Sequence, residues 1–307
     1  MAYPTTVVPA TEVVPVESQQ DVFINKKRIW DPSKGYQRAI FGGHLLGQSV
    51  RAAEQTVPDA YDVHSLQSVF LKAGDARNDV FYHVERVLDG RTLSSRLVRA
   101  VQGDVVIFVA TIGFQRGRGG QVAPAGGSLS YQQPVPEWAK VVDPGDESLI
   151  SSRDMLAITG FPRSLIDNFH HPFEWRYLPP EPTAEPTEFR TRSVFRSFPL
   201  DTDQRQVHLA AMAWTSDVFL IYTSNLANPA KFPVGMQNVA IETSVNHSAW
   251  FHSPSSRIDE WIACERRTTW GADGRVLIYQ TWWSKDDGRL ILSCVQEALL
   301  RLKTANL

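Results

Sequence analysis

Apolar positions along this chain follow two periods, and the order of those periods predicts its elements. Between residues 42 and 57 the spacing is helical and makes one apolar stripe, formed by Leu46, Val50, Ala53 and Val57. Four segments of strand-like pattern follow, at about residues 63–72, 80–88, 92–102 and 105–115. A helix followed by an antiparallel meander predicts an α+β unit whose sheet curls around the helix.

The same order of elements then occurs a second time. A strand is expected at about residues 189–198 and a helix within 208–222, followed by strands at about 238–251, 261–269, 275–283 and 290–301. Short motifs match between the copies: His64-Ser65 corresponds to His247-Ser248, and Asp89-Gly-Arg91 corresponds to Asp273-Gly-Arg275. A unit used twice, about 180 residues apart, indicates a duplicated domain.

These patterns divide the chain into four segments. Residues 1–20 are rich in Val, Pro and Thr and are expected to form a flexible tail, before a first unit at 21–116 that opens with a strand at about 22–30. Residues 117–187 are irregular and rich in Gly and Pro, which predicts a connector with a Pro-rich insert. The second unit is expected at 188–307.

Composition excludes several classes of function. The chain has 307 residues, 31 basic and 33 acidic, and a net charge of −2, which argues against a nucleic-acid partner or a polybasic membrane surface. No apolar run approaches the roughly 20 residues that a membrane span needs. The two cysteines, Cys264 and Cys294, fall in predicted strands, and we expect them to be core residues in a reducing compartment.

Known cofactor and metal motifs are missing from the sequence. It has no phosphate-binding loop, no Rossmann glycine pattern and no Gly-x-Ser-x-Gly elbow. His247 and His252 are five residues apart in an extended segment, so they face opposite sides, and no cysteine or carboxylate lies at ligand spacing. We therefore expect neither a cofactor nor a metal.

Asp217 is the strongest candidate for chemistry. Residues 209–222 are apolar nearly throughout, so this segment is predicted to be the buried central helix of the second unit. A buried carboxylate is costly unless it has partners, and it is a candidate general base. The first copy has no aspartate in its helix at 42–57. The alternative is that Thr215, Ser216 and Asp217 form an N-cap.

Two further polar residues are weaker candidates. Gln296 shares the predicted inner face of the last strand with Cys294 and Ala298, so its amide must bond a buried water, a substrate, Asp217 or the backbone. The equivalent Gln115 in the first copy favours a structural role. Pattern alone makes Ser244 a polar strand residue with a structural role.

Several motifs together resemble a known family. Residues 41–48 read Phe-Gly-Gly-His-Leu-Leu-Gly-Gln, and further matching motifs lie at 63–75, 89–91, 112–115, 213–217, 246–252 and 295–297. The chain resembles the type II acyl-CoA thioesterases over about residues 20–302. This resemblance implies a double hotdog fold, an α+β architecture of two tandem units, which agrees with the duplication.

The resemblance also implies a mechanism and a set of site residues. In that family an Asp, a Thr or Ser, and a Gln in the second hotdog orient a water that attacks the thioester carbonyl. By motif position these residues are Asp217, Ser244 and Gln296. Substrate-binding positions are expected at the open N–H groups of a helix start and at three motif residues, namely Gly42, Gly43, His44, Asn246 and His247.

The sequence departs from the family pattern at three positions. Ser244 replaces the common Thr, Asn246 replaces the Asp of an Asp-His-Ser motif, and His44 stands where Gln is common. The expected function is hydrolysis of acyl-CoA or a related acyl thioester to free acid and thiol. The alternatives are a biosynthetic relative that carries out dehydration, cyclisation or acyl transfer in the same pocket, and a non-catalytic acyl-binding protein.

The sequence gives limited expectations for cellular location, partners and oligomeric state. Ala305-Asn306-Leu307 is loosely similar to the Ser-Lys-Leu peroxisomal signal, so we expect a peroxisomal or a cytoplasmic protein. The expected partner is the thioester substrate. A homo-oligomer is compatible with the resemblance, because hotdog units often pair through their sheets.

Overall fold

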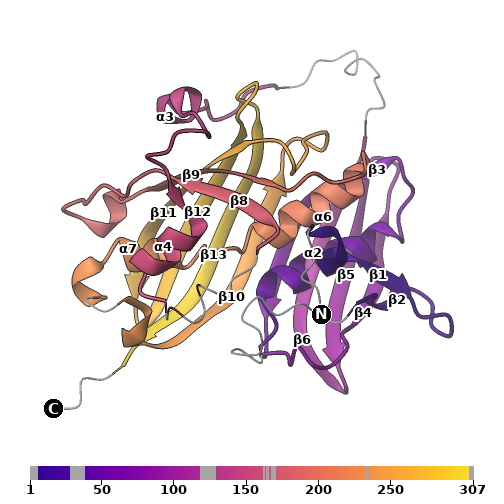
Figure 1. Ribbon diagram of the computed structural model, residues 1–307. Coiled ribbons are helices and arrows are strands. Elements are labelled where there is room, and N and C mark those ends of the chain that lie inside the picture. The colour runs from indigo at the N-terminus through magenta and orange to yellow at the C-terminus, as the bar shows by residue number, and fades with distance from the viewer. Residues whose placement is uncertain are drawn as a thin grey trace.

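A computed structural model describes residues 6–27, 39–117, 129–161, 163, 166, 171–232 and 235–303. Its strands form one 13-stranded sheet in the order β1-β2-β4-β5-β6-β3-β10-β13-β12-β11-β9-β8-β7. The two long helices, α2 and α6, lie side by side against this sheet (Figure 1). The expected α+β architecture is therefore present.

The first half begins earlier than the sequence pattern predicts. Helix α1 (Val8–Thr11) and strand β1 (Val13–Pro15) precede β2 (Val22–Asn25), and β1 pairs with β2. Val7 and Ala10 are buried in the main core. The expected flexible tail at 1–20 is thus wrong for residues 6–16, because their apolar side chains cover the end of the core beside α2.

The first hotdog unit agrees closely with the predicted elements. Its helix α2 (Gly42–Glu54) is followed by β3 (Tyr61–Phe70), β4 (Phe81–Asp89), β5 (Leu93–Gln102) and β6 (Val105–Arg116). The face of α2 with Leu46, Val50 and Ala53 is fully buried. Burial of this face against the sheet holds the helix in place.

The segment expected as a connector contributes to the second half. It contains α3 (Glu137–Val141), β7 (Ile150–Ser151), α4 (Ser152–Ile158) and β8 (Phe173–Tyr177). Strand β8 pairs with β9 and extends the sheet, and its alternate residues Phe173, Trp175 and Tyr177 are buried. The second unit therefore begins before residue 188. The sequence pattern did not predict β8 because its alternation of apolar and polar residues is only five residues long and is flanked by prolines.

The second hotdog unit repeats the first. It comprises η1 (Pro186–Glu188), β9 (Thr191–Ser197), α6 (Arg205–Thr215), α7 (Tyr222–Leu226), η2 (Pro229–Lys231), η3 (Gly235–Asn238), β10 (Val239–Phe251), β11 (Ile262–Ala272), β12 (Arg275–Ser284) and β13 (Leu290–Leu302). Strand β10 pairs antiparallel with β3, which joins both curved sheets into one. Cys264 and Cys294 are free and buried in it.

Small residues allow α2 and α6 to pack closely. A Cβ at Gly47 would lie 3.0 Å from Ala210 O, and one at Gly43 would lie 2.4 Å from Trp214 O. The N-terminus of α2 consequently lies beside the C-terminus of α6. This contact brings a helix end of the first unit to the centre of the second.

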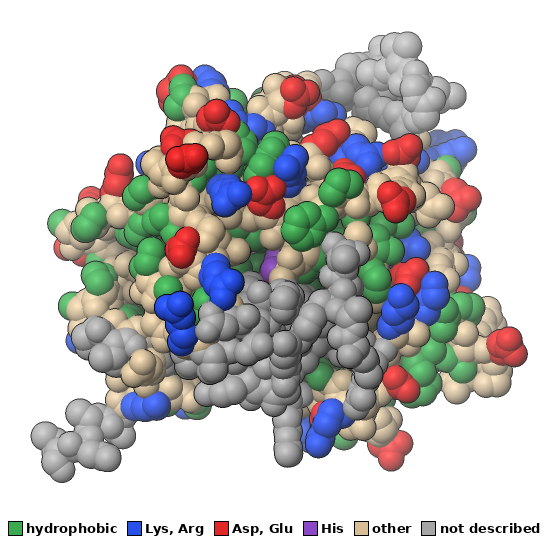
Figure 2. Space-filling model, in the orientation of Figure 1, with side chains coloured by type: hydrophobic (Ala, Val, Ile, Leu, Met, Phe, Trp, Pro, Cys, Tyr) green, Lys and Arg blue, Asp and Glu red, His purple; other side chains and the backbone are tan. Residues whose placement is uncertain are grey.

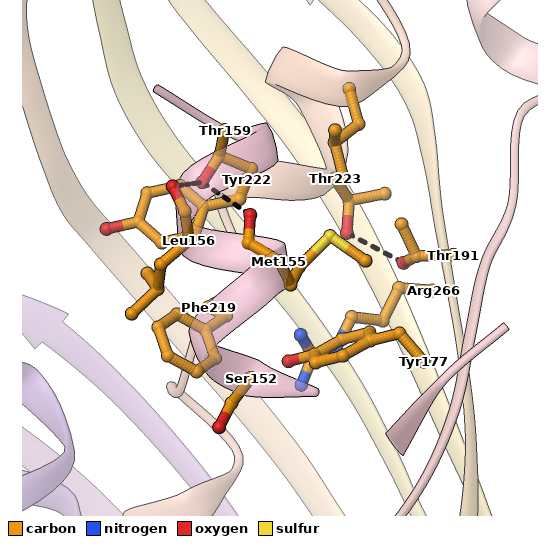
Figure 3. A pocket seen from close by; sticks show the side chains of 11 residues that line it. Ser152, Met155, Leu156, Thr159, Tyr177, Thr191, Phe219, Tyr222, Thr223 and Arg266 are labelled. Atoms are coloured by element: carbon orange, nitrogen blue, oxygen red, sulfur yellow. Dashed lines mark hydrogen bonds between the residues drawn. The ribbon is translucent and has the colours of Figure 1, made fainter. Parts of the chain in front are cut away.

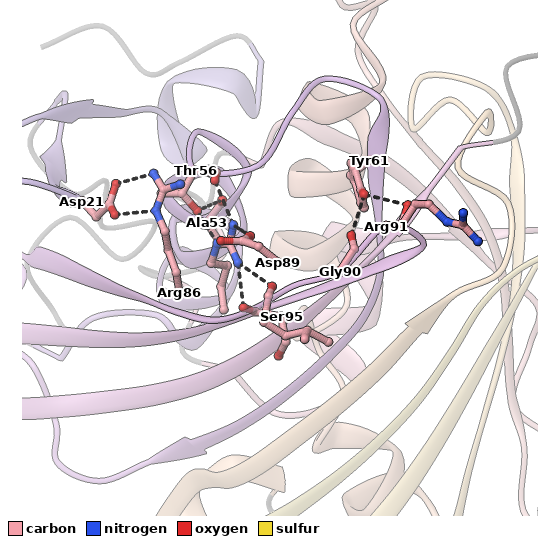
Figure 4. A network of polar contacts seen from close by, with 11 residues as sticks. Asp21, Ala53, Thr56, Tyr61, Arg86, Asp89, Gly90, Arg91 and Ser95 are labelled. Carbon is pink, nitrogen blue, oxygen red and sulfur yellow. Dashed lines mark hydrogen bonds and ion pairs between the residues drawn. The ribbon is translucent and has the colours of Figure 1, made fainter.

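One polar network in the first half makes structural contacts. Figure 4 shows the network around Thr56 and Asp89, in which buried Arg96 donates to both residues. On the face shown in Figure 2, acidic and basic side chains are interspersed. Among the described residues, no helix is both long and apolar enough to cross a bilayer.

Candidate active site

Asp217 lies just beyond the end of α6. The helix ends at Thr215 with Ser216 as its C-cap, and α7 begins only at Tyr222. Phe219, with φ of 56°, turns the chain between them. Asp217 is therefore neither inside the central helix nor at an N-cap, and both sequence interpretations of its local structure are wrong. Its predicted burial is confirmed, with 7% of the residue exposed.

The surroundings of Asp217 bring the pKa of its carboxyl close to neutral pH. Burial raises the pKa of this carboxyl from 3.8 to about 7, because the charged form loses water. Hydrogen bonds from Gln296, Ser244 and the Gly43 N–H oppose this shift, as does the positive charge of Arg266. A carboxylate with a pKa near the working pH is suited to general-base chemistry.

Ser244 and Gln296 approach Asp217 from neighbouring strands. Ser244 Oγ donates to Asp217 Oδ1 at 3.3 Å, and Gln296 Nε2 donates to Ser244 Oγ at 3.1 Å. The structure thus brings together the three residues to which the resemblance assigns catalysis. Gln296 is fully buried and Ser244 is partly exposed.

An irregularity in β10 places Ser244 and His247 near the same amide. The pairing of β10 with β13 shifts register between Ser244 and Asn246. In a regular strand, residues three apart face opposite sides of the sheet. The bulge removes that opposition, so Ser244 and His247 both contact Gln296.

His247 is a buried partner of Gln296. Its Nδ1 lies 2.5 Å from Gln296 Oε1 and its Nε2 lies 2.9 Å from Ser216 Oγ. Burial lowers the pKa of His247 from 6.5 to about 4, so the ring is neutral at pH 7 and carries one proton. Because the amide oxygen can only accept, Nδ1 carries this proton. These contacts involve protein side chains and do not test the expected role in substrate binding.

The N-terminus of α2 faces the same carboxylate. The backbone N–H of Gly43 donates to Asp217, and a Cβ added to Gly42 would lie 2.6 Å from Asp217 Oδ2. A helix start favours negative charge through its free N–H groups and its dipole. The expected open N–H groups therefore lie at the site, although that of Gly43 is directed at Asp217.

Two other expected binding residues make structural contacts. His44 is fully buried, with Nδ1 3.3 Å from Trp214 Nε1 and 3.2 Å from Ala10 O. Asn246 donates through Nδ2 to Glu297 Oε2 at 2.8 Å. These contacts connect neighbouring elements, and binding of substrate by His44 or Asn246 stays a prediction.

Sequence reasoning missed a polar layer beneath Asp217. Gln280 Nε2 donates to Ser216 O at 3.0 Å, and Gln280 Oε1 accepts from Arg266 Nε at 2.7 Å. The sequence could have indicated this layer, since alternation along the predicted strand at 261–269 places Arg266 on the same face as Ile262 and Cys264. A single arginine on an apolar strand face is a buried polar group that requires a reason.

Comparison with known proteins identifies the family. Models of the acyl-CoA thioesterase N-terminal and C-terminal domains match residues 31–115 and 146–300. Acyl-coenzyme A thioesterase 8 of Homo sapiens is 30% identical over 302 residues, which cover 95% of this chain and 89% of the relative. The chain belongs to the type II acyl-CoA thioesterase family.

Further relatives agree with this assignment. Peroxisomal acyl-coenzyme A thioester hydrolase 1 of Saccharomyces cerevisiae is 25% identical over 306 residues, which cover 85% of each chain. The crystal structure of acyl-CoA thioesterase II TesB2 from Mycobacterium marinum matches with a TM-score of 0.73 and 23% identity, covering 98% of this chain and 99% of that one. The double hotdog fold of this thioesterase is thereby confirmed.

Proposed function

We propose that this thioesterase hydrolyses acyl-CoA to a free acid and CoA through a water activated by Asp217. The observation that carries this proposal is the set of donors around one buried carboxylate. Ser244, Gln296 and the Gly43 N–H all bond Asp217, which fixes its orientation and leaves it able to accept a proton from water.

The reaction follows from this arrangement. Asp217 accepts a proton as the water oxygen attacks the thioester carbonyl. The tetrahedral intermediate then expels the CoA sulfur, which takes this proton from Asp217 and leaves the carboxylate ready for the next cycle. Ser244 and Gln296 hold the water and the carboxylate. In this proposal the carbonyl oxygen binds near the start of α2, where the helix dipole would stabilise the developing negative charge.

The Asp217→Asn variant tests this proposal. Asparagine has the size of aspartate but cannot accept the proton, so kcat for CoA release is expected to fall by about 10²- to 10⁴-fold. The circular dichroism spectrum is expected to match that of the wild type. An Asp217→Asn enzyme with unchanged kcat would remove Asp217 from the mechanism.

A matched substitution at the surface controls for a general effect of losing an aspartate. Asp273 lies in the turn between β11 and β12 and is exposed. Asp273→Asn is expected to retain wild-type kcat. Equal losses in both variants would show that the assay reports stability rather than chemistry.

We also propose a peroxisomal location, which the name of the yeast relative supports. The Ala305-Asn306-Leu307 tripeptide lies outside the described residues. A fluorescent protein fused before residue 1 is expected to coincide with a peroxisomal marker, and to spread through the cytoplasm when the last three residues are deleted. A diffuse signal from the intact fusion would reject this location.

A further inference from the structure

A second carboxyl group lies beside the proposed catalytic centre, on the same strand as Ser244. Glu242 and Ser244 are two residues apart on β10, in a stretch where the pairing with β13 keeps its register. Residues two apart on a strand project from the same face of a sheet. Because Ser244 contacts Asp217, Glu242 projects from the face that carries the reacting groups, about 6.7 Å further along the strand.

The carboxyl of Glu242 has no partner in the described part of the chain. None of these residues forms a hydrogen bond or an ion pair with it. Glu242 is nevertheless only partly exposed, and burial raises its pKa from 4.5 to about 8. Thr243, on the opposite face, is exposed. Partial removal of a carboxyl from water is unfavourable without a hydrogen bond, and a donor group on a ligand would supply one.

Tyr222 supplies a hydroxyl on the same side of the site. It is the first residue of α7, and its ring packs against those of Phe219 and Phe161, with centroids 5.7 Å and 5.2 Å away. Figure 3 shows Tyr222 at one side of a small cavity, with its hydroxyl directed away from Arg266. The hydroxyl is therefore held in place by packing of the ring.

The Tyr222 hydroxyl lies near both carboxyls. Burial raises its pKa well above 10, and the negative charges of Glu242 and Asp217 raise it further. Among the described residues, this hydroxyl has no hydrogen-bond partner. An unused donor and an unused acceptor thus lie near each other, next to the proposed catalytic carboxylate.

An amide group is complementary to this pair. Its oxygen accepts from a hydroxyl and its N–H donates to a carboxyl, which can accept through an oxygen in either protonation state. Every acyl-CoA carries such an amide in its pantetheine arm, with the nitrogen four bonds from the thioester carbonyl carbon. With that carbon held at Asp217 and Ser244, this amide is within reach of Glu242.

We propose that Glu242 and Tyr222 bind the first amide of the pantetheine arm. Glu242 accepts from the amide N–H, and Tyr222 donates to the amide oxygen. This inference rests on the proposed function and assigns the side of the site that holds CoA. Since the amide is linked to the thioester by only a few bonds, its contacts also hold the carbonyl carbon against the water at Asp217.

The test uses three octanoyl thioesters that differ only in the thiol. N-Acetylcysteamine supplies the amide, 2-mercaptoethyl acetate replaces its N–H by oxygen, and pentanethiol lacks both polar groups. The wild type is expected to favour the amide over the ester by about tenfold in kcat/KM for thiol release, because the ester leaves Glu242 without a donor. Glu242→Leu is expected to lose this preference. Glu242→Gln keeps an acceptor oxygen and is expected to retain part of it.

The hydroxyl of Tyr222 is tested by the same substrates. Tyr222→Phe is expected to lower kcat/KM several-fold for the amide and the ester, which both carry a carbonyl oxygen, and to leave the pentanethiol substrate unchanged. An equal loss with all three substrates would show that Tyr222 only supports the fold. This variant also tests the site independently if Glu242→Leu does not fold.

A surface glutamate provides the matched control. Glu260 is exposed just before β11, and Glu260→Leu is expected to keep the full preference for the amide.

The outcomes separate this inference from the proposed function. Equal hydrolysis of the amide and ester substrates by the wild type would overturn the amide site and leave the thioesterase mechanism intact. A preference that persists in Glu242→Leu would overturn the role of Glu242. Failure of the wild type to hydrolyse octanoyl-CoA would reject the proposed function and this inference with it.

Discussion

His247 Nδ1 and Gln296 Oε1 are 2.5 Å apart on neighbouring strands, and this contact determines how the amide faces Asp217. With Oε1 held by the ring, Nε2 is directed to Ser244 and Asp217. A rotated amide would direct an acceptor at the carboxylate, and two acceptors repel each other. The neutral histidine therefore specifies the donor that orients Asp217.

Removal of the imidazole is expected to impair kcat more than KM. In His247→Leu the amide of Gln296 is free to rotate, so the water and Asp217 are less well held, and kcat is expected to fall by about tenfold to a hundredfold. Steady-state kinetics with one acyl-CoA measure this effect. His252, which directly follows β10 and contacts Ser293 on β13, provides the control: His252→Leu is expected to leave kcat unchanged.

A methyl group at residue 42 is expected to displace the carboxylate. The Cβ of Gly42→Ala would lie 2.6 Å from Asp217 Oδ2 and 2.9 Å from the ring of Phe70, so Asp217 must shift, and kcat is expected to fall by about a hundredfold. Gly271→Ala, whose Cβ would meet nothing nearer than 3.4 Å, controls for an added methyl group. Wild-type kcat in Gly42→Ala would contradict the packing described here.

The rate should depend on the protonation of Asp217. Because burial raises the pKa of this group to about 7, kcat/KM is expected to rise with pH through a single step centred near 7. Ser244→Ala removes a donor that lowers this pKa, so the step should move to higher pH. Ser248→Ala serves as a control on the same strand. A step that stays in place in Ser244→Ala would rule out the assignment to Asp217.

Ionisation of the same carboxyl should also destabilise the fold as the pH rises from 4 to 7. Its pKa is about 7 in the folded chain, against an ordinary value of 3.8 for an exposed aspartate, so the folded chain binds the proton more tightly than the unfolded chain. The free energy of unfolding should thus decrease between pH 4 and 7, by up to about 4 kcal/mol. Asp217→Asn lacks this effect. Denaturant titrations should find it more stable than the wild type at pH 8 and similar at pH 4.

Most of the fold could be predicted from the sequence because its elements are long and strongly periodic. The predicted strand at 290–301 differs from β13 by one residue at its end. The N-terminus and β8 could not be found in this way. Val7, Ala10 and Phe173 lie in short segments, and only tertiary contacts with α2, α6 and β9 show that they belong to the core.

The site was predictable as a set of residues but not as a geometry. Asp217 stood out as a carboxylate in an apolar segment, and the family motif indicated Ser244 and Gln296. The end of α6 at Thr215 could not be anticipated, because the apolar run continues to Tyr222. The role of His247 depends on a bulge in β10, and a sequence pattern does not reveal a register shift.

The hydrogen bond from Gly43 to Asp217 joins a donor in one repeat to an acceptor in the other. In the proposed mechanism, neither repeat alone contains all the groups that surround Asp217. A mutation near Gly43 in the first repeat is thus expected to reduce the activity that depends on Asp217 in the second. Substitutions in one copy are therefore constrained by the residues of the other. Covalent fusion keeps these complementary parts at a fixed one-to-one ratio, which two separate polypeptides could achieve only by finding each other in solution.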